Sequence, residues 1–152
     1  VDAGAAHYIQ SGLGEGRSSN LRSGYDKITQ GISGDGGNNV LTGGTAAALI
    51  EGGGGNDTIT GGGADDVLAG GAGSDLFIFA NGAGNDIIAD FNALDANEKI
   101  NLAWVSSITD AADLFAIHLS VVNGVVTIQD GANSIALVGV TLGDLDASDF
   151  IF

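Results

Sequence analysis

The feature that most constrains this chain is a nine-residue repeat that runs without a break from residue 34 to residue 78. In register the copies read GDGGNNVLT, GGTAAALIE, GGGGNDTIT, GGGADDVLA and GGAGSDLFI. A sixth copy, NGAGNDIIA at 81–89, follows an insertion of Phe79 and Ala80. A helix would lose about 1 kcal/mol for each glycine relative to alanine. Each copy is therefore predicted to be a glycine turn followed by a short strand.

One large apolar residue recurs at the eighth position of each copy. If successive strands alternate between two walls of a flattened solenoid, residues eighteen apart stack on each other. The predicted inner columns are Ile32, Ile50 and Leu68 on one wall and Leu41, Ile59 and Phe77 on the other. Ile88 continues the series after the insertion. The predicted fold class is all-β, a parallel β-roll solenoid of nonapeptide repeats with a C-terminal β-rich cap.

After Asp90 the nine-residue period stops and ordinary strand patterns begin. Two apolar runs flank Asn123-Gly124, a strong hairpin signal. A short capped helix is expected over 109–116, and another over 141–148. Trp104 is expected in the core of this part. Residues 92–152 are therefore predicted to form a cap that covers the end of the solenoid.

The first thirty residues differ in composition, since they hold Arg17, Arg22 and Lys27, three of the four basic residues of the chain. We expect residues 1–30 to be an N-terminal cap or lead-in, residues 31–91 the roll and residues 92–152 the cap. A partly disordered remnant of an upstream domain is an equally good interpretation of residues 1–30. The basic cluster could contact an acidic polysaccharide, although a solvated cluster is the simpler interpretation.

The charge of the chain excludes several functions. Nineteen acidic residues against four basic ones give a formal net charge of −15, which disfavours nucleic acids and anionic membranes as partners. The lack of Cys excludes disulfides, thiol catalysis and Cys-ligated zinc. No apolar run approaches the roughly 18 residues of a membrane span. Cationic ligands are the better expectation, and the absence of Met suggests a piece of a longer protein.

The repeats resemble the G-G-x-G-x-D-x-U-x nonapeptides of the RTX family, which implies a calcium-binding parallel β-roll over residues 31–91. Calcium takes six to eight oxygen ligands at about 2.3 to 2.6 Å. Two copies depart from the family pattern, because Asn39 and Ala48 stand where Asp is expected. The calcium sites that would use those positions are therefore in question.

The resemblance also implies a ligand set with about three calcium ions. Its side-chain members are Asp57, Asp66, Asp75 and Asp86, with Asp90 closing the last site and Asn39 paired with Asp57. Backbone carbonyls near Gly53, Gly55, Gly62 and Gly71 are expected to fill the shell. The competing interpretation is that these carboxylates only bond turn amides, as Asp often does. Asp65, at the fifth position of its copy, is expected to face solvent.

The C-terminal part strengthens the resemblance. The segments 86–91, 98–102, 138–142 and 149–152 are similar to the end of serralysin-type and related type I secretion domains. That similarity implies an uncleaved export signal at the C-terminus, matched by Asp149-Phe-Ile-Phe152. It also implies the type I secretion apparatus as a partner and a secreted, extracellular location.

Two functional hypotheses follow. In the first, the chain is a calcium-binding module that folds on calcium binding after secretion, and is the C-terminal part of a larger protease, lipase or other exoenzyme. In the second, it is a carbohydrate-binding or adhesion module, similar to the calcium-binding module of an alginate epimerase. An enzyme in its own right is not expected, because His7 and His118 belong to no HExxH motif and no nucleophile has a positioned base.

Overall fold

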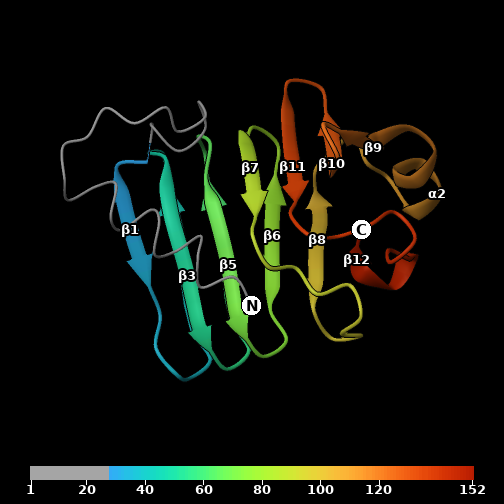
Figure 1. The fold of residues 1–152 in the computed structure, drawn as a ribbon. Helices are drawn as coiled ribbons and strands as arrows, with labels where there is room; N and C mark the ends of the chain where they lie inside the picture. Colours follow the sequence, from blue (N-terminus) through green and yellow to red (C-terminus); the bar gives the residue numbers. More distant parts are fainter. Residues whose placement is uncertain (1–27) are drawn as a thin grey trace.

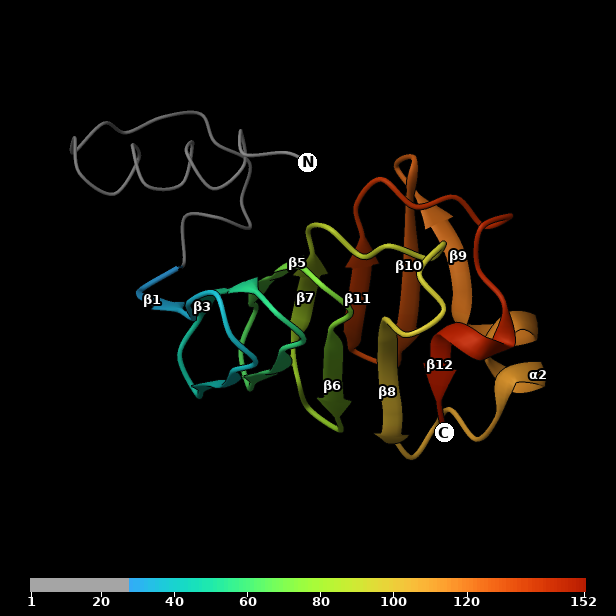
Figure 2. The ribbon, with the colours of Figure 1, turned by 90° about the horizontal axis from the view of Figure 1, so that it is seen from below.

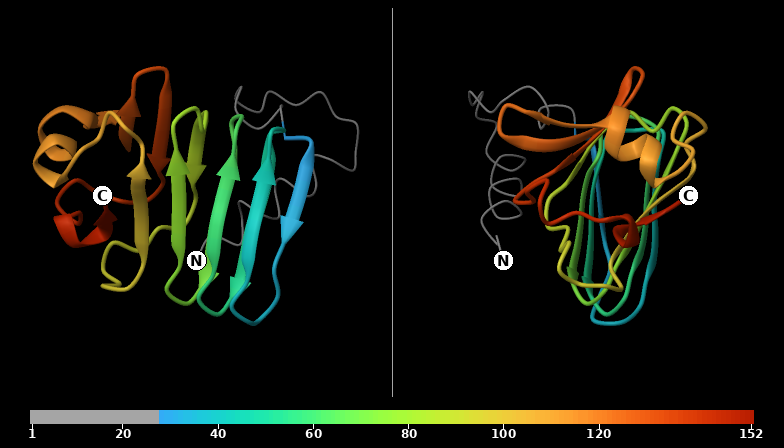
Figure 3. Two further views of the ribbon diagram at one scale, coloured as in Figure 1. Left: turned by 180° about the vertical axis from the view of Figure 1, so that it is seen from behind. Right: turned by 90° about the vertical axis from the view of Figure 1, so that its right-hand side faces the viewer.

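The structure is a computed structural model that describes residues 28–152. The expected cap or lead-in over residues 1–30, with its basic cluster, lies almost wholly outside the described residues. Within them the chain winds between two facing sheets, which Figure 3 shows from the end as a flattened solenoid. No helix in the described part of the chain has the length and apolar character needed to cross a membrane.

The first sheet has seven strands in the order β1-β3-β5-β7-β11-β10-β9. These strands are β1 Gln30–Ser33, β3 Ala48–Gly54, β5 Val67–Ala72, β7 Asn85–Ile88, β11 Asn133–Leu137, β10 Val125–Asp130 and β9 Leu119–Val122. The second sheet has five strands in the order β12-β8-β6-β4-β2. They are β12 Phe150–Ile151, β8 Lys99–Trp104, β6 Leu76–Ala80, β4 Thr58–Gly62 and β2 Val40–Gly44. Figure 1 shows strands of both sheets along the length of the molecule, and we call β1 to β7 the roll and β8 to β12 the cap.

The register of the parallel strands confirms the two predicted columns. In the first sheet the stacked residues are Ile32, Ile50, Leu68 and Ile88. In the second they are Leu41, Ile59, Phe77 and Ile100. The two-residue insertion does not break the stack, because Val67 still pairs with Ile87. The eighth position of each copy therefore supplies one inward side chain per strand.

The glycines of the turns are required by how closely successive turns stack. A Cβ on Gly62 would lie less than 3.0 Å from the carbonyl oxygen of Gly44, and one on Gly73 would be as close to the oxygen of Gly55. Both residues also have positive φ, at 104° and 131°. Ala64 occupies the same kind of position with φ 92°, a conformation that costs a residue with a Cβ.

The cap continues both sheets of the roll. Strand β8 pairs in parallel with β6, β11 with β7, and β12 with β8. The boundary placed after residue 91 stays a prediction, since the pairing runs across it. The hairpin at Asn123-Gly124 is confirmed, with positive φ at both residues as a two-residue turn requires.

Two short helical segments lie at the end of the molecule opposite β1 (Figure 2). The first, α2 Ala111–Asp113, is capped by the Asp110 side chain and runs directly into a π-helical turn, Leu114–His118. The second is a 3-10 turn at Ala147–Asp149. The first begins within the predicted range 109–116 and ends at residue 118, whereas the second overlaps the predicted range 141–148 only at residues 147 and 148.

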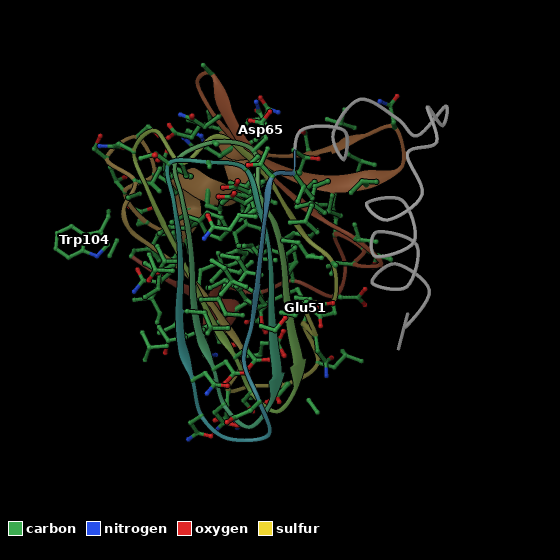
Figure 4. The ribbon with its side chains drawn as sticks, turned by 90° about the vertical axis from the view of Figure 1, so that its left-hand side faces the viewer. Glu51, Asp65 and Trp104 are labelled. Carbon is green, nitrogen blue, oxygen red and sulfur yellow. The ribbon has the colours of Figure 1, made fainter. Side chains whose placement is uncertain are left out.

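The prediction that Trp104 belongs to the core of the cap is wrong. Its side chain is 69% exposed and points away from the sheets (Figure 4). Strict alternation along β8 would turn Trp104 inward, as it does Ile100 and Leu102. A register irregularity between β6 and β8 near Ala80, which pairs with Trp104, breaks the alternation.

Candidate metal site in the turns of the roll

Four aspartates at the sixth position of the repeat are almost fully buried. Asp57, Asp66, Asp75 and Asp86 are each 1% exposed and lie where a turn enters the next strand. Burial of an ionised carboxylate is costly unless a counter-charge is present. Among residues 28–152 Lys99 is the single Lys or Arg, against sixteen acidic residues. The chain's own described residues therefore offer almost no positive charge to these carboxylates.

One oxygen of each carboxylate bonds the backbone of the preceding layer. The amide of Asn39 donates to Asp57 Oδ1 at 2.7 Å, and that of Asp57 donates to Asp75 Oδ1 at 2.8 Å. On the opposite edge Ala48 donates to Asp66 at 2.8 Å and Asp66 to Asp86 at 2.9 Å. The interpretation that these side chains bond turn amides thus accounts for one oxygen of each.

The second oxygen has no such partner. The Oδ2 atoms of Asp57, Asp66 and Asp86 are buried and accept no hydrogen bond from the described residues. Asp57 Oδ2 and the Gly70 carbonyl oxygen both lie less than 3.0 Å from the point where a Cβ on Gly52 would stand. A buried carboxylate oxygen without a donor therefore lies beside a carbonyl oxygen, which is an arrangement that a cation would resolve.

Burial raises the pKa of the aspartates that lie deepest. It raises the pKa of Asp66 and Asp75 above the ordinary value, and it raises the pKa of Asp86 to about 8, helped by the charges of Asp66 and Asp65. Without a cation, Asp86 would hold a proton at neutral pH. A bound cation would allow it to ionise.

The two remaining predicted side chains are differently placed. Asn39 is engaged within its own turn, since its Oδ1 accepts from the Asp35 amide at 2.9 Å. Asp90 accepts the amides of Gly70 and Gly71 on its two oxygens, both at 2.9 Å. Asn39 and Asp90 each place an oxygen in the stacked turns, but neither has a buried oxygen without a hydrogen-bond donor, as Asp57 has. Their role as ligands stays a prediction.

Glu98 is a buried acid that sequence reasoning missed. It is 4% exposed, and its Oε1 accepts from the Asn92 amide at 3.0 Å. Burial, followed by the charges of Asp75, Asp90 and Asp95, raises its pKa to about 7. Glu98 precedes β8 as Asp75 precedes β6, so it extends the same column. It lies outside the nine-residue period, and only its place before an apolar strand could have signalled it.

The carbonyls predicted as ligands are placed in part. Those of Gly53 and Gly55 face the following turn, because each lies less than 3.0 Å from a Cβ built on Gly71 or Gly73. Gly62 and Gly71 have the left-handed turn conformation, with φ of 104° and 96°. Among the described residues no three acidic or histidine side chains converge on one point. A cation in these turns would therefore take many of its ligands from backbone oxygens, as hard cations such as calcium do.

Asp65 is expected to face solvent, but in the structure it also bonds to the next turn. It is half-buried at one edge of the roll (Figure 4), and its Oδ1 accepts from the Asn85 amide at 3.0 Å. His118 lies in the cap, where Nδ1 is 2.6 Å from the Gln129 carbonyl oxygen and Nε2 is 3.5 Å from Asp113. It is far in the chain from the turns, and His7 lies outside the described residues.

Comparison with known proteins agrees with this geometry. Residues 32–47 and 44–77 match the profile of the RTX calcium-binding nonapeptide repeat, in four copies. No curated protein matches the chain.

Two solved structures are similar to the chain, and the first of them supports the fold. The AlgE6R2 subunit of the Azotobacter vinelandii mannuronan C5-epimerase matches with a TM-score of 0.56 and 23% identity, over 81% of this chain and 92% of that one. The extracellular lipase LipA from Serratia marcescens matches with a TM-score of 0.47 and 24% identity, over 80% of this chain. The match covers 20% of the lipase, so the chain spans about a fifth of its length. Over residues 32–77, the stacked turns of this all-β parallel roll thus match RTX calcium-binding nonapeptide repeats.

Proposed function

We propose that this chain is a calcium-dependent folding module of a larger secreted protein, exported by a type I secretion apparatus and folded by calcium outside the cell. The observation that carries the proposal is the set of buried Oδ2 atoms of Asp57, Asp66 and Asp86, which have no donor among the described residues. The parent protein is proposed to be a protease, a lipase or another exoenzyme. This chain contains RTX repeats, and the proposal assigns any catalytic activity to the parent protein.

The residues of the turns fit calcium. Their donors are carboxylate and carbonyl oxygens only, and they stack in successive layers on both edges of the roll. Bound calcium would supply the positive charge that the buried carboxylates lack. We propose about three ions, held chiefly by Asp57, Asp66, Asp75 and Asp86.

Other groups complete the proposed sites. Asp90 and Glu98 flank Asp75 at the end of one edge, and Asn39 stands at its beginning. The carbonyls of Gly53, Gly55, Gly62 and Gly71 are proposed as further ligands. Without the ion, carboxylates that stay ionised must admit water, and water between the turns separates the stacked strands.

The test is a calcium titration of metal-stripped protein, followed by circular dichroism and calorimetry. We expect strand signal to appear as calcium is added and Asp66→Asn to weaken binding strongly. Asp110→Asn is the matched control, because Asp110 caps α2 in the cap, away from the turns. Equal strand content in excess chelator and in millimolar calcium would refute the proposal.

The export signal is proposed to lie in residues 149–152. In the folded chain Asp149 and Phe150 are buried, Phe150 pairs with Ile100, and its ring packs 6.0 Å from that of Phe115. A receptor could therefore read Asp149 and Phe150 only before the cap folds, whereas Ile151 and Phe152 are exposed in the folded chain. Removal of residues 149–152 should stop export by a type I system, while Trp104→Ala should not. Undiminished export of the shortened chain would place the signal elsewhere.

A second candidate function is that of a carbohydrate-binding or adhesion module, similar to the calcium-binding module of an alginate epimerase. The exposed Trp104 favours it, since an exposed indole can stack on a sugar ring. The sixteen acidic residues of 28–152 count against an acidic polysaccharide unless calcium bridges the two. Calorimetry with alginate, with and without calcium, separates the candidates. Binding that Trp104→Ala abolishes would support the second.

A further inference from the structure

A second ladder of side chain to backbone bonds runs beside the aspartates. At the fifth position of the repeat, Asn38 Oδ1 accepts from the Asn56 amide at 2.8 Å. Asn56 Oδ1 in turn accepts from the Ser74 amide at 3.0 Å. These bonds reach forward to the next layer, whereas each aspartate reaches back to the previous one. The pair Asn56-Asp57 thus joins its own turn to both neighbours, the next through Asn56 and the previous through Asp57.

The forward bond fixes the direction of a backbone carbonyl. The N–H and C=O of a trans peptide point in opposite directions. Because the amide of Asn56 points back to Asn38, the Gly55 carbonyl must point forward to the turn at 70–75. The structure agrees, since a Cβ on Gly73 would lie less than 3.0 Å from the Gly55 oxygen. By the same geometry Asn56 directs the carbonyl of Gly73.

We propose that Asn38 and Asn56 are positioning residues for the calcium sites, because they aim the carbonyls of Gly55 and Gly73 at the following turn. This inference rests on the proposed calcium function and adds to it. Neither asparagine is proposed to touch the ion. Each acts through the peptide group between the fourth and fifth positions of the next layer, Gly55–Asn56 or Gly73–Ser74, one residue ahead of Asp57 or Asp75.

Two further observations agree with a shared role for the fifth and sixth positions. On the other edge Asp65 Oδ1 accepts the Asn85 amide at 3.0 Å, so the forward bond survives the two-residue insertion. In the copy at 43–51 both positions are alanine, Ala47 and Ala48. The copy without the ligand is therefore also the copy without the positioning side chain.

The test is a double-mutant cycle in the full chain, read as calcium affinity by chelator competition. Removal of an outer-shell partner of a metal ligand typically costs about tenfold or more in affinity. We expect Asn56→Ala to weaken one site about tenfold. Asn56→Asp keeps the acceptor oxygen and should keep the affinity. In an Asp75→Asn background Asn56→Ala should have no further effect, whereas in Asp66→Asn the tenfold loss should remain.

A control and a second readout separate positioning from general stability. Asn101 Oδ1 accepts the Ala103 amide at 2.9 Å, the same kind of bond in β8 outside the turns. Asn101→Ala should leave calcium affinity unchanged, and only Asn56→Ala should speed hydrogen exchange at the Ser74 amide in calcium. Equal losses in the Asp75→Asn and Asp66→Asn backgrounds, or no loss in either, would overturn the inference. If the unchanged chain binds no calcium, the proposed function itself fails.

Discussion

The roll and the cap share two continuous sheets, yet the buried sixth-position aspartates of the roll and the exposed turn aspartates of the cap have opposite environments. In the roll, burial raises the pKa of Asp66, Asp75 and Asp86. In the cap, hydrogen bonds from nearby residues lower the pKa of the exposed Asp144 and Asp146. The cap thus uses carboxylates to stabilise its turns, while the roll pays a desolvation cost that its own residues do not relieve.

The apolar core is narrower in the roll than in the cap. Most strands of the roll supply one large inward residue, such as Ile50 or Ile59, whereas β6 buries both Phe77 and Phe79. In the cap, side chains from β8, the π-helical turn and β10 meet, including Leu102, Leu114 and Ile128, all at most 1% exposed. Continuous sheets can therefore draw their stability from different sources, and four predictions test that contrast.

Removal of calcium should have the largest effect and should act unevenly. We expect amide protection to be lost throughout β1 to β7, because the buried carboxylates then repel and take up water. The hairpin of β9 and β10 should keep more of its protection. Hydrogen exchange with residue resolution, in chelator and in calcium, measures both regions at once. Uniform loss across roll and cap would remove the distinction.

Lowering the pH should stabilise the metal-stripped roll. Asp86, with a pKa of about 8 in the folded chain against 3.8 ordinarily, favours folding when protonated. Its stabilisation is therefore present near pH 4 and is lost as pH rises through 8. Glu98, with a pKa near 7, acts in the same direction. Circular dichroism at pH 5 and pH 8 without metal should show more strand at pH 5.

With calcium present, the protein should show more strand at pH 8 than at pH 5, because ligands must lose their protons to bind the ion. Asp86→Asn is the control, and it should flatten the pH dependence of the metal-stripped protein. Strand content that rises with pH in the absence of metal would contradict the assignment.

Variants with a truncated core side chain in the cap or in the roll should differ in how much stability they regain when calcium is raised. Leu114→Ala in the cap and Ile59→Ala in the roll should each cost about 2 to 5 kcal/mol of unfolding free energy. Raising calcium should restore much of the loss for Ile59→Ala, since the ion binds the roll. It should restore less for Leu114→Ala. Urea unfolding at two calcium concentrations makes the measurement, and equal rescue would show one cooperative unit.

The smallest expected effect is a gain in the roll. Ala64 has φ 92°, where glycine is unstrained, so Ala64→Gly should stabilise the calcium-loaded roll by about 1 kcal/mol. Ala69→Gly, in the extended strand β5, should instead destabilise it by about 0.5 to 1 kcal/mol. Thermal melts in excess calcium compare the pair. A loss of stability in both variants would argue against strain at Ala64.

The repeat period predicts the roll well because one physical constraint recurs in every copy. A stacked turn needs glycine where carbonyls approach, and the strand needs one inward residue, so Gly62 and Ile59 could be placed from spacing alone. Asn123-Gly124 predicted its hairpin for an equally local reason, the positive φ of both residues.

The features that escaped prediction depend on contacts between distant segments. Glu98 is a site residue only because β8 pairs with β6, and Trp104 is exposed only because that pairing is irregular. The bonds made by Asn38 and Asn56 required the register of successive turns. Periodicity indicates which residues stack, but it does not show which atoms of those residues meet.

The backward reach of each aspartate has a consequence for how such arrays tolerate change. Each sixth-position aspartate accepts a hydrogen bond from the backbone of the preceding layer. Loss of one carboxylate should therefore destabilise the layer before the altered residue. Ala48 would serve only Gln30 in the outermost strand β1, while its own amide is still held by Asp66. A ligand can therefore be dispensed with at the first described strand of the roll, whereas the same loss in the middle would destabilise a turn whose own sequence is intact.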